Sequence, residues 1–155
     1  MVVVGLLSIL VAIVSVNYKA PLRRARLQNT LERIGGLDRR LRLVAINSGH
    51  AAELRIDVDK GLFSSTNHRG QEAFAESYKL PSAISLDRIL VSGCKTTNEE
   101  TRLRFTSHGT TATYAICLAL PNDEQRWLLI VGRTGQTIVF NDEKDVKPLL
   151  SPDRK

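Results

Sequence analysis

The sequence predicts an α+β protein, in which a long N-terminal helix precedes a small head of antiparallel β-sheet or sandwich. Three observations support this expectation. The first charged residue is Lys19, so the chain opens with 18 uncharged residues. Residues 22–48 then repeat apolar side chains at helical spacing, and short apolar segments separated by turn residues follow Gly49. With 155 residues, of which 43% are hydrophobic, the chain can bury the core of one modest domain.

Residues 1–21 are predicted to form a hydrophobic membrane helix. At about 1.5 Å per residue, 18 uncharged residues reach about 27 Å, slightly less than the roughly 30 Å of a hydrocarbon core. The alternatives are a buried helix of a globular core and a cleaved signal peptide. A signal peptide is disfavoured because the run has no basic start and no A-x-A cleavage site. The side chains expected to anchor this helix are Val2, Val3, Val4, Leu6, Leu7, Ile9, Leu10, Val11, Ile13 and Val14.

Residues 22–48 are predicted to be an amphipathic helical segment that ends near Ser48. Gly35 and Gly36 lie inside it and are expected to break or bend it, which gives two helices or one kinked helix. Gly49 stands at a plausible C-cap position. The apolar stripe is narrow and needs a surface to lie against. Its members are Leu27, Leu31 and Ile34, followed by Leu37, Leu41 and Val44.

The net charge of +6 is confined to one segment. Residues 19–42 hold eight basic and two acidic side chains, whereas residues 43–155 hold fourteen of each. The basic excess therefore lies beside the predicted membrane helix, where it can meet anionic head groups. A general surface for binding polyanions is not indicated. By itself, this cluster favours a cytoplasmic location for the rest of the chain.

Residues 49–143 are predicted to form the antiparallel β head, and residues 144–155 a loose C-terminal tail. Leu54, Ile56 and Val58 alternate with charged residues, which is typical of a half-buried strand. Residues 132–137 lie between two apolar segments and are interpreted as a hairpin turn rather than a phosphate loop. The extended segments are expected at 54–58, 62–64, 74–80, 84–91, 103–105, 112–120, 127–131 and 137–140.

No group of residues indicates catalysis, a cofactor or a metal. The three histidines, His50, His68 and His108, fall in predicted loops without metal-ligand spacing. Asp57 and Asp59 form a D-x-D pattern, but a strand end and a turn explain it without a metal.

Two further groups leave alternatives open. Asn141, Asp142, Glu143 and Asp145 could hold calcium through their side-chain oxygens, although a solvated acidic loop is the stronger interpretation. Cys94 and Cys117 could pair in an oxidising compartment, and two small buried hydrophobic residues are the alternative.

The order of these segments resembles that of type IV pilins and type II secretion pseudopilins. Residues 1–13 are similar to the apolar run of the family's N-terminal helix. The segments 41–49 (LRLVAINSG), 52–58, 103–109 (LRFTSHG) and 128–136 (LLIVGRTGQ) resemble blocks of the H-type (GspH/FimT-like) minor pseudopilins and minor pilins. The family's cleavage glycine and its following glutamate would lie upstream of Met1. We therefore expect the in-frame DNA before Met1 to encode them.

The resemblance implies a pilin-like fold and a structural role without enzymatic activity. Its expected partners are other major and minor pseudopilins or pilins, the inner membrane and, if the true N-terminus lies upstream, the prepilin peptidase. The protein would be a single-pass inner-membrane protein with its head in the periplasm. The apolar helix would lie in the filament core and pack against sister helices, in a short pilus that drives secretion or initiates a type IV pilus.

Two alternatives remain. One is a single-span envelope protein with no role in a filament. The other is a DNA-binding minor pilin for uptake, in which basic side chains of the tail would contact phosphate. Acidic neighbours dilute that charge, so DNA is not expected as a partner. The side chains of this alternative are Lys144, Lys147, Arg154 and Lys155.

Overall fold

The structure, a computed structural model, describes residues 19–67, 76–93, 100–120 and 124–151. The chain divides into two units, residues 1–33 and residues 34–155. Helix α2 (Lys19–Ser48) begins in the first unit and ends in the second. The anchor residues predicted between Val2 and Val14 lie outside the described part.

In the first unit, the described residues are the beginning of helix α2. Thr30 donates its hydroxyl to the carbonyl of Arg26, one helical turn earlier, at 2.9 Å. Gln28 donates to Glu32, four residues later, at 3.1 Å. Such pairs add modest local support to a helix. Leu22 is 56% exposed.

Helix α2 continues through Gly35 and Gly36, so the predicted break at these glycines is wrong. Gly35 lies beside a residue that is far away in the sequence. A Cβ atom at Gly35 would lie 3.2 Å from the Cγ2 atom of Thr137, so the missing side chain allows a close approach there. The helix ends as expected: Gly49 has a φ of +66°, in the left-handed region that glycine adopts without strain.

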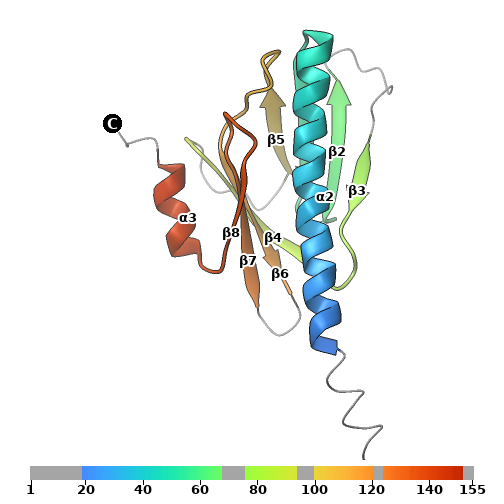
Figure 1. The fold of residues 1–155 in the computed structure, drawn as a ribbon, viewed down its shortest axis with the longest axis vertical. Coiled ribbons are helices and arrows are strands. Elements are labelled where there is room, and N and C mark those ends of the chain that lie inside the picture. Colours follow the sequence, from blue (N-terminus) through green and yellow to red (C-terminus); the bar gives the residue numbers. More distant parts are fainter. Residues whose placement is uncertain (1–18, 68–75, 94–99, 121–123, 152–155) are drawn as a thin grey trace, which may run out of the picture. The chain divides into compact units, whose positions relative to one another are not determined.

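The head contains two four-stranded antiparallel sheets (Figure 1). Sheet A has the strand order β3-β2-β1-β5, and sheet B has the order β4-β6-β7-β8. The strands are β1 (Ala52–Asp57), β2 (Leu62–Asn67), β3 (Ser77–Lys79), β4 (Ser85–Val91), β5 (Glu100–Phe105), β6 (Tyr114–Ala119), β7 (Gln125–Ile130) and β8 (Thr137–Phe140).

The predicted α+β class and antiparallel head are therefore confirmed. Each expected extended segment overlaps one of these strands, although residues 74 and 75 lie outside the described part. The turn predicted at 132–137 connects β7 to β8, as expected for a hairpin. In β1, Ala52, Leu54 and Ile56 are buried and alternate with more exposed residues, so sheet A has one core-facing side.

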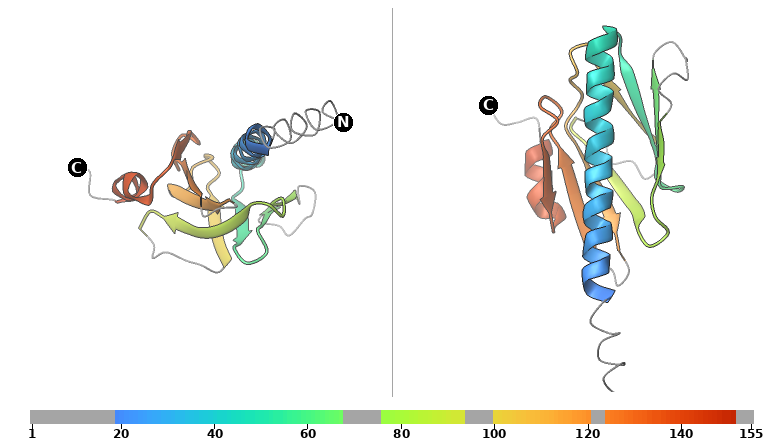
Figure 2. Two further views of the ribbon diagram at one scale, coloured as in Figure 1. Left: turned by 90° about the horizontal axis from the view of Figure 1, so that it is seen from below. Right: turned by 45° about the vertical axis from the view of Figure 1, so that its right-hand side comes forward.

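Within the second unit, the last part of helix α2 lies against the sheets (Figure 2). Its buried side combines apolar residues with one acidic and one basic side chain. These buried residues are Ile34, Leu37, Asp38, Leu41, Arg42 and Ala45.

Sheet B is covered on both faces. The buried positions of β6 and β7 are consecutive rather than alternating. On the side away from the helix α2 contacts lies α3 (Glu143–Leu150), whose Val146 and Leu150 are buried in a cluster with Cys117 and Trp127. The prediction of a loose tail is therefore wrong up to Leu150, because an apolar pair four residues apart packs a helix onto the sheet.

Candidate functional site

The centre of the head is a buried polar network formed by Asp38, Arg42 and Tyr114. Arg42 donates from Nε to Oδ2 of Asp38 at 2.6 Å, and from Nη2 to Oδ1 at 3.3 Å. The Tyr114 hydroxyl donates to Oδ1 of the same carboxylate at 2.9 Å. Asp38 and Tyr114 are fully buried and Arg42 is 7% exposed. Because a charge in such a place is costly without partners, the three side chains depend on one another.

Arg42 also binds two loops of the head. Its Nη1 atom donates to the carbonyl of Gly132 at 2.6 Å and to that of Gly109 at 2.8 Å. Its Nη2 atom lies 3.4 Å from the carbonyl oxygen of Val131, and the guanidinium lies 5.4 Å from the centre of the Phe105 ring. One helical side chain thus holds both the β5–β6 loop and the β7–β8 turn against helix α2.

Glycines make room for this arrangement. Gly135 has a φ of +72°, and a Cβ atom there would lie 2.8 Å from Nε of Arg42. A Cβ atom at Gly132 would lie 2.0 Å from the carbonyl oxygen of Thr111, which is backbone and cannot yield easily. The turn between β7 and β8 therefore needs glycine at both positions for the loops and the guanidinium to approach each other.

The network is structural in its chemistry. Burial and the Asp38 carboxylate raise the pKa of Tyr114 well above its ordinary value, so the phenol stays protonated. The Arg42 donors and the Asp38 oxygens face other groups of the protein. The arrangement fixes the last turns of helix α2 relative to two loops, and it offers no activated nucleophile or proton acceptor to a substrate.

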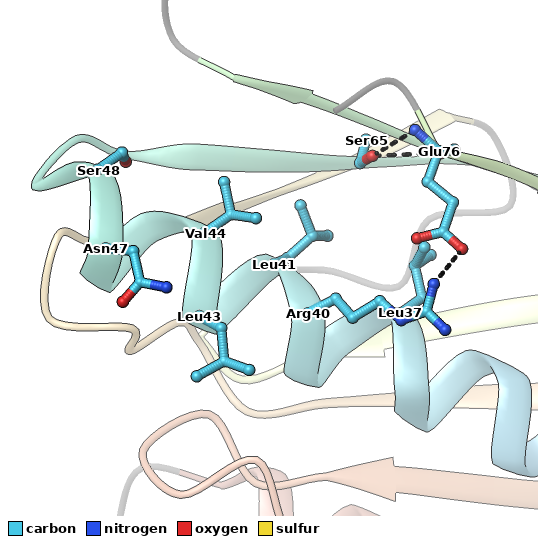
Figure 3. Close-up of a pocket in the computed structure, with 9 residues that line it drawn as sticks. All are labelled: Leu37, Arg40, Leu41, Leu43, Val44, Asn47, Ser48, Ser65 and Glu76. Atoms are coloured by element: carbon cyan, nitrogen blue, oxygen red, sulfur yellow. Dashed lines mark hydrogen bonds and ion pairs between the residues drawn. The ribbon is translucent and has the colours of Figure 1, made fainter. Parts of the chain in front are cut away.

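A groove lies between helix α2 and sheet A (Figure 3). Its volume is about 480 Å³, and Leu37, Leu41 and Val44 give it an apolar wall. Leu41 and Val44 point toward β2, whereas Leu43 points away and is 57% exposed (Figure 3). The size and lining are in the range of pockets that accept a small ligand or an apolar side chain.

On its sheet side the groove is lined by a small residue, Ser65. Ser65 of β2 is buried, and its hydroxyl accepts from the backbone N–H of Glu76 at 3.1 Å. Glu76 in turn accepts from Arg40 at 2.7 Å across the groove, between side chains that are 49% and 70% exposed. An ion pair this exposed contributes little to stability. It lies at the rim of the groove and does not hold the groove closed.

Some of the polar groups singled out in the sequence have local partners. Asp57 accepts from the backbone and the ammonium group of Lys60, and these hydrogen bonds lower the pKa of the carboxyl group. His50 and His108 are exposed, and His68 lies outside the described residues. Among the described residues, no group of three or more potential ligands could hold a metal ion. Asp142 stands at the N-cap of α3, and Glu143 pairs with Arg88 and Lys147.

The structure describes one of the two cysteines. Cys117 is free and buried between β4 and β7, and burial raises the pKa of its thiol to about 12. It behaves as one of the two small buried hydrophobic residues that the sequence indicated. Cys94 lies outside the described residues.

The basic side chains proposed for DNA do not form one free surface in the described part of the chain. Lys147 pairs with Glu143 at 2.9 Å, on the same helix as Lys144. Arg154 and Lys155 lie outside the described residues, as do the anchor side chains between Val2 and Val14. Over the residues that are described, no helix is both long and apolar enough to cross a membrane.

The sequence analysis missed the Asp38–Arg42–Tyr114 network. A signal was present, because Asp38 and Arg42 stand four residues apart on the same helix face as Leu41 and Ala45. Opposite charges at that spacing, inside an apolar stripe, indicate a buried pair. They were instead counted with the basic cluster beside the predicted membrane helix.

The structure has a pilin-like α+β fold, in which an N-terminal helix is followed by two antiparallel four-stranded sheets. No family model matches the sequence, and no curated protein sequence does. Solved structures do match.

The minor pseudopilin EpsH of the type 2 secretion system of Vibrio cholerae superimposes with a TM-score of 0.59 at 15% identity, over 76% of this chain and 97% of that one. A crystal structure of the same pseudopilin gives a TM-score of 0.57 at 17% identity, over 74% and 93% of the two chains. The type IV minor pilin FimU of Pseudomonas aeruginosa gives 0.52 at 17% identity, over 79% and 92%. At these identities the likeness establishes the fold.

Proposed function

We propose that this protein is a minor pseudopilin of a type II secretion system or a minor pilin of a type IV pilus. It is a structural subunit, without catalytic activity, that helps to initiate or cap a periplasmic pilus. The observation that carries the proposal is the match to two such heads over nearly their whole length, 97% of the EpsH chain and 92% of the FimU chain.

The rest of the chain supports this proposal. Residues 1–18 contain no charged side chain, which suits a helix that anchors the subunit in the inner membrane and packs against sister helices in a filament. The head then lies in the periplasm. Within the head, the Arg42 network holds the last turns of helix α2 against two loops.

The test is isolation of the full-length tagged chain from membranes of its own organism after mild crosslinking. We expect the other pilin-like subunits encoded in the same genome to be recovered with it. A variant with a charge in the apolar run, Leu10→Lys, is expected to lose them, while Ser8→Ala keeps the run apolar and serves as the matched control.

Deletion of the gene separates the two machines. Loss of protein secretion assigns the subunit to a secretion system, and loss of surface pili assigns it to a type IV pilus. Recovery of the chain without any pilin-like subunit, together with normal secretion and normal piliation in the deletion strain, would favour the single-span envelope protein and refute the proposal.

A further inference from the structure

Helix α3 covers an apolar surface that the rest of the head would otherwise expose. Its Val146 is fully buried and its Leu150 is 8% exposed. Beneath them lie side chains of three neighbouring strands of sheet B, and Ile138 and Phe140 of β8 pack at the edge of the same cluster. The covered side chains are Leu90 of β4, Ala115 and Cys117 of β6, and Trp127 and Leu129 of β7.

The polar attachments of α3 are weak or few. Arg88 of β4 reaches Glu143 at 3.3 Å, between side chains that are 36% and 28% exposed. An ion pair with this exposure contributes little to stability. At the other end of the helix, the hydroxyl of Ser92 donates to the carbonyl of Leu150 at 2.8 Å. The helix is therefore held mainly by its two buried apolar side chains.

The helix is also weak in itself. It has eight residues, Pro148 lies inside it, and the N-cap residue Asp142 makes no side-chain capping bond. Isolated helices shorter than about 12 residues are marginal in water, and an internal proline removes one backbone hydrogen bond. The helical form of residues 143–150 thus depends on contact with the sheet.

The sheet does not depend on α3 in the same way. Strands β4, β6 and β7 are joined through their own antiparallel ladders, from Ser85↔Ala119 to Val91↔Tyr114 and from Tyr114↔Ile130 to Ala119↔Gln125. The other face of the same strands carries Ile116 and Leu128, which are buried outside this cluster. Removing α3 would expose one face and leave the strand pairing intact.

We propose that α3 is a strap that lifts off sheet B as a local unit while both sheets remain paired, and that it thereby uncovers a latent apolar surface around Cys117 and Trp127. Segments with few anchors open at a lower free energy than the whole domain, because opening breaks only their own contacts. The hinge lies at Asn141 and Asp142, between β8 and the first residue of the helix.

Cys117 reports the opening directly. In the closed state it is buried under α3, and the raised pKa of its thiol leaves almost no reactive thiolate. The chain has two cysteines, so Cys94→Ser makes Cys117 the single thiol. The experiment measures labelling of this full-length variant in detergent by an aromatic disulfide reagent at pH 8, with and without urea.

If α3 opens locally, labelling in the absence of urea is at least about tenfold faster than the rate allowed by the global unfolding equilibrium. Val146→Ala removes two buried methyl groups and is expected to raise the rate about tenfold or more. Glu143→Gln removes the ion pair with Arg88 and is expected to raise it by no more than about fivefold.

The matched control is Ile56→Val, a substitution in the fully buried position of β1 in the other sheet. Ile56→Val is expected to lower the global stability. If α3 opens alone, this substitution leaves the rate of Cys117 labelling without urea unchanged. The proposal is overturned if Ile56→Val and Val146→Ala accelerate labelling in proportion to their effects on global unfolding. It is also overturned if the labelling rate without urea never exceeds the rate allowed by the global unfolding equilibrium. Because the measurement uses an isolated chain, its outcome is independent of whether the protein enters a filament.

Discussion

Replacement of Arg42 by methionine tests whether the buried network holds the head together. Methionine keeps much of the length and the apolar stem of the side chain but removes the guanidinium. Asp38 then keeps a buried charge with the Tyr114 hydroxyl as its remaining partner, and the carbonyls of Gly109 and Gly132 lose a donor. Breaking a buried ion pair in this way costs about 3–5 kcal/mol.

That cost is large for this protein. A domain of ordinary stability unfolds with about 5–15 kcal/mol, so Arg42→Met removes a large share of the total. For a head of this size, the loss corresponds to a fall in melting temperature on the order of 10–20 °C. Arg42→Lys is expected to recover only part of it, because an ammonium group cannot reach Asp38 and two loops with the geometry of the planar guanidinium.

The assay is urea unfolding of the full-length chain followed by fluorescence of Trp127, the single tryptophan, which is 1% exposed. The control is Arg39→Met, an exposed arginine on the same helix, which is expected to change the unfolding free energy by less than about 0.5 kcal/mol. In the double variant Asp38→Asn/Arg42→Met the effects should fall short of additivity by about 0.5–3 kcal/mol, since no unpaired charge remains. Equal midpoints for Arg42→Met and Arg39→Met would refute the assignment.

Three further outcomes follow from the structure. Burial raises the pKa of Tyr114 well above its ordinary value and that of Cys117 to about 12, so the folded protein keeps protons that the unfolded chain releases. Stability should therefore be complete below about pH 9 and fall above it, by up to about 1.4 kcal/mol per pH unit for each group. Urea titrations at pH 8 and pH 11 check this, and the double variant Tyr114→Phe/Cys117→Ala should lose most of the pH dependence. An unfolding free energy of the parent that is the same at both pH values would contradict it. Deletion of residues 1–21 should leave a folded monomer, and its circular dichroism should show mainly strand signal with some helix; an unfolded product would mean that the head needs its anchor or a partner. In a gel-shift titration at about 0.15 M salt, the head should not bind DNA tightly, because residues 43–155 carry balanced charge; sub-micromolar binding abolished by substituting Lys144, Lys147, Arg154 and Lys155 would promote the DNA-uptake alternative.

The strands were predictable because their signals are local. The alternation of Leu54, Ile56 and Val58 depends on residues within one segment, and so do the turn residues between the later strands. The continuity of helix α2 was not predictable in this way. Gly35 lies beside Thr137, more than a hundred positions away in the chain, and a local stretch of sequence gives no sign of that contact.

The buried network lies between these two cases. The spacing of Asp38 and Arg42 inside an apolar stripe indicated a buried pair, and was available from the sequence. The sequence did not reveal the partners that decide the role of Arg42. They are the carbonyls of Gly109 and Gly132, in loops that lie beside the helix only in the folded protein. Backbone acceptors have no signature in residue identity, so the sequence could suggest the pair but not the two loops it holds.

Helix α3 could be predicted from the residues of β6 and β7 more readily than from residues 144–155 themselves. In an antiparallel sheet with one buried face, apolar residues alternate. Residues 114–118 and 127–130 are hydrophobic at every position, and they pair with each other, so both faces of the sheet carry apolar side chains. A cover is then needed, and Val146 and Leu150, four residues apart after the last strand, can supply it only as a helix. The same reasoning explains why residues 143–150, which form a helix of low intrinsic stability, can still be packed on sheet B most of the time. The apolar surface beneath α3, more than any property of these residues, determines its position.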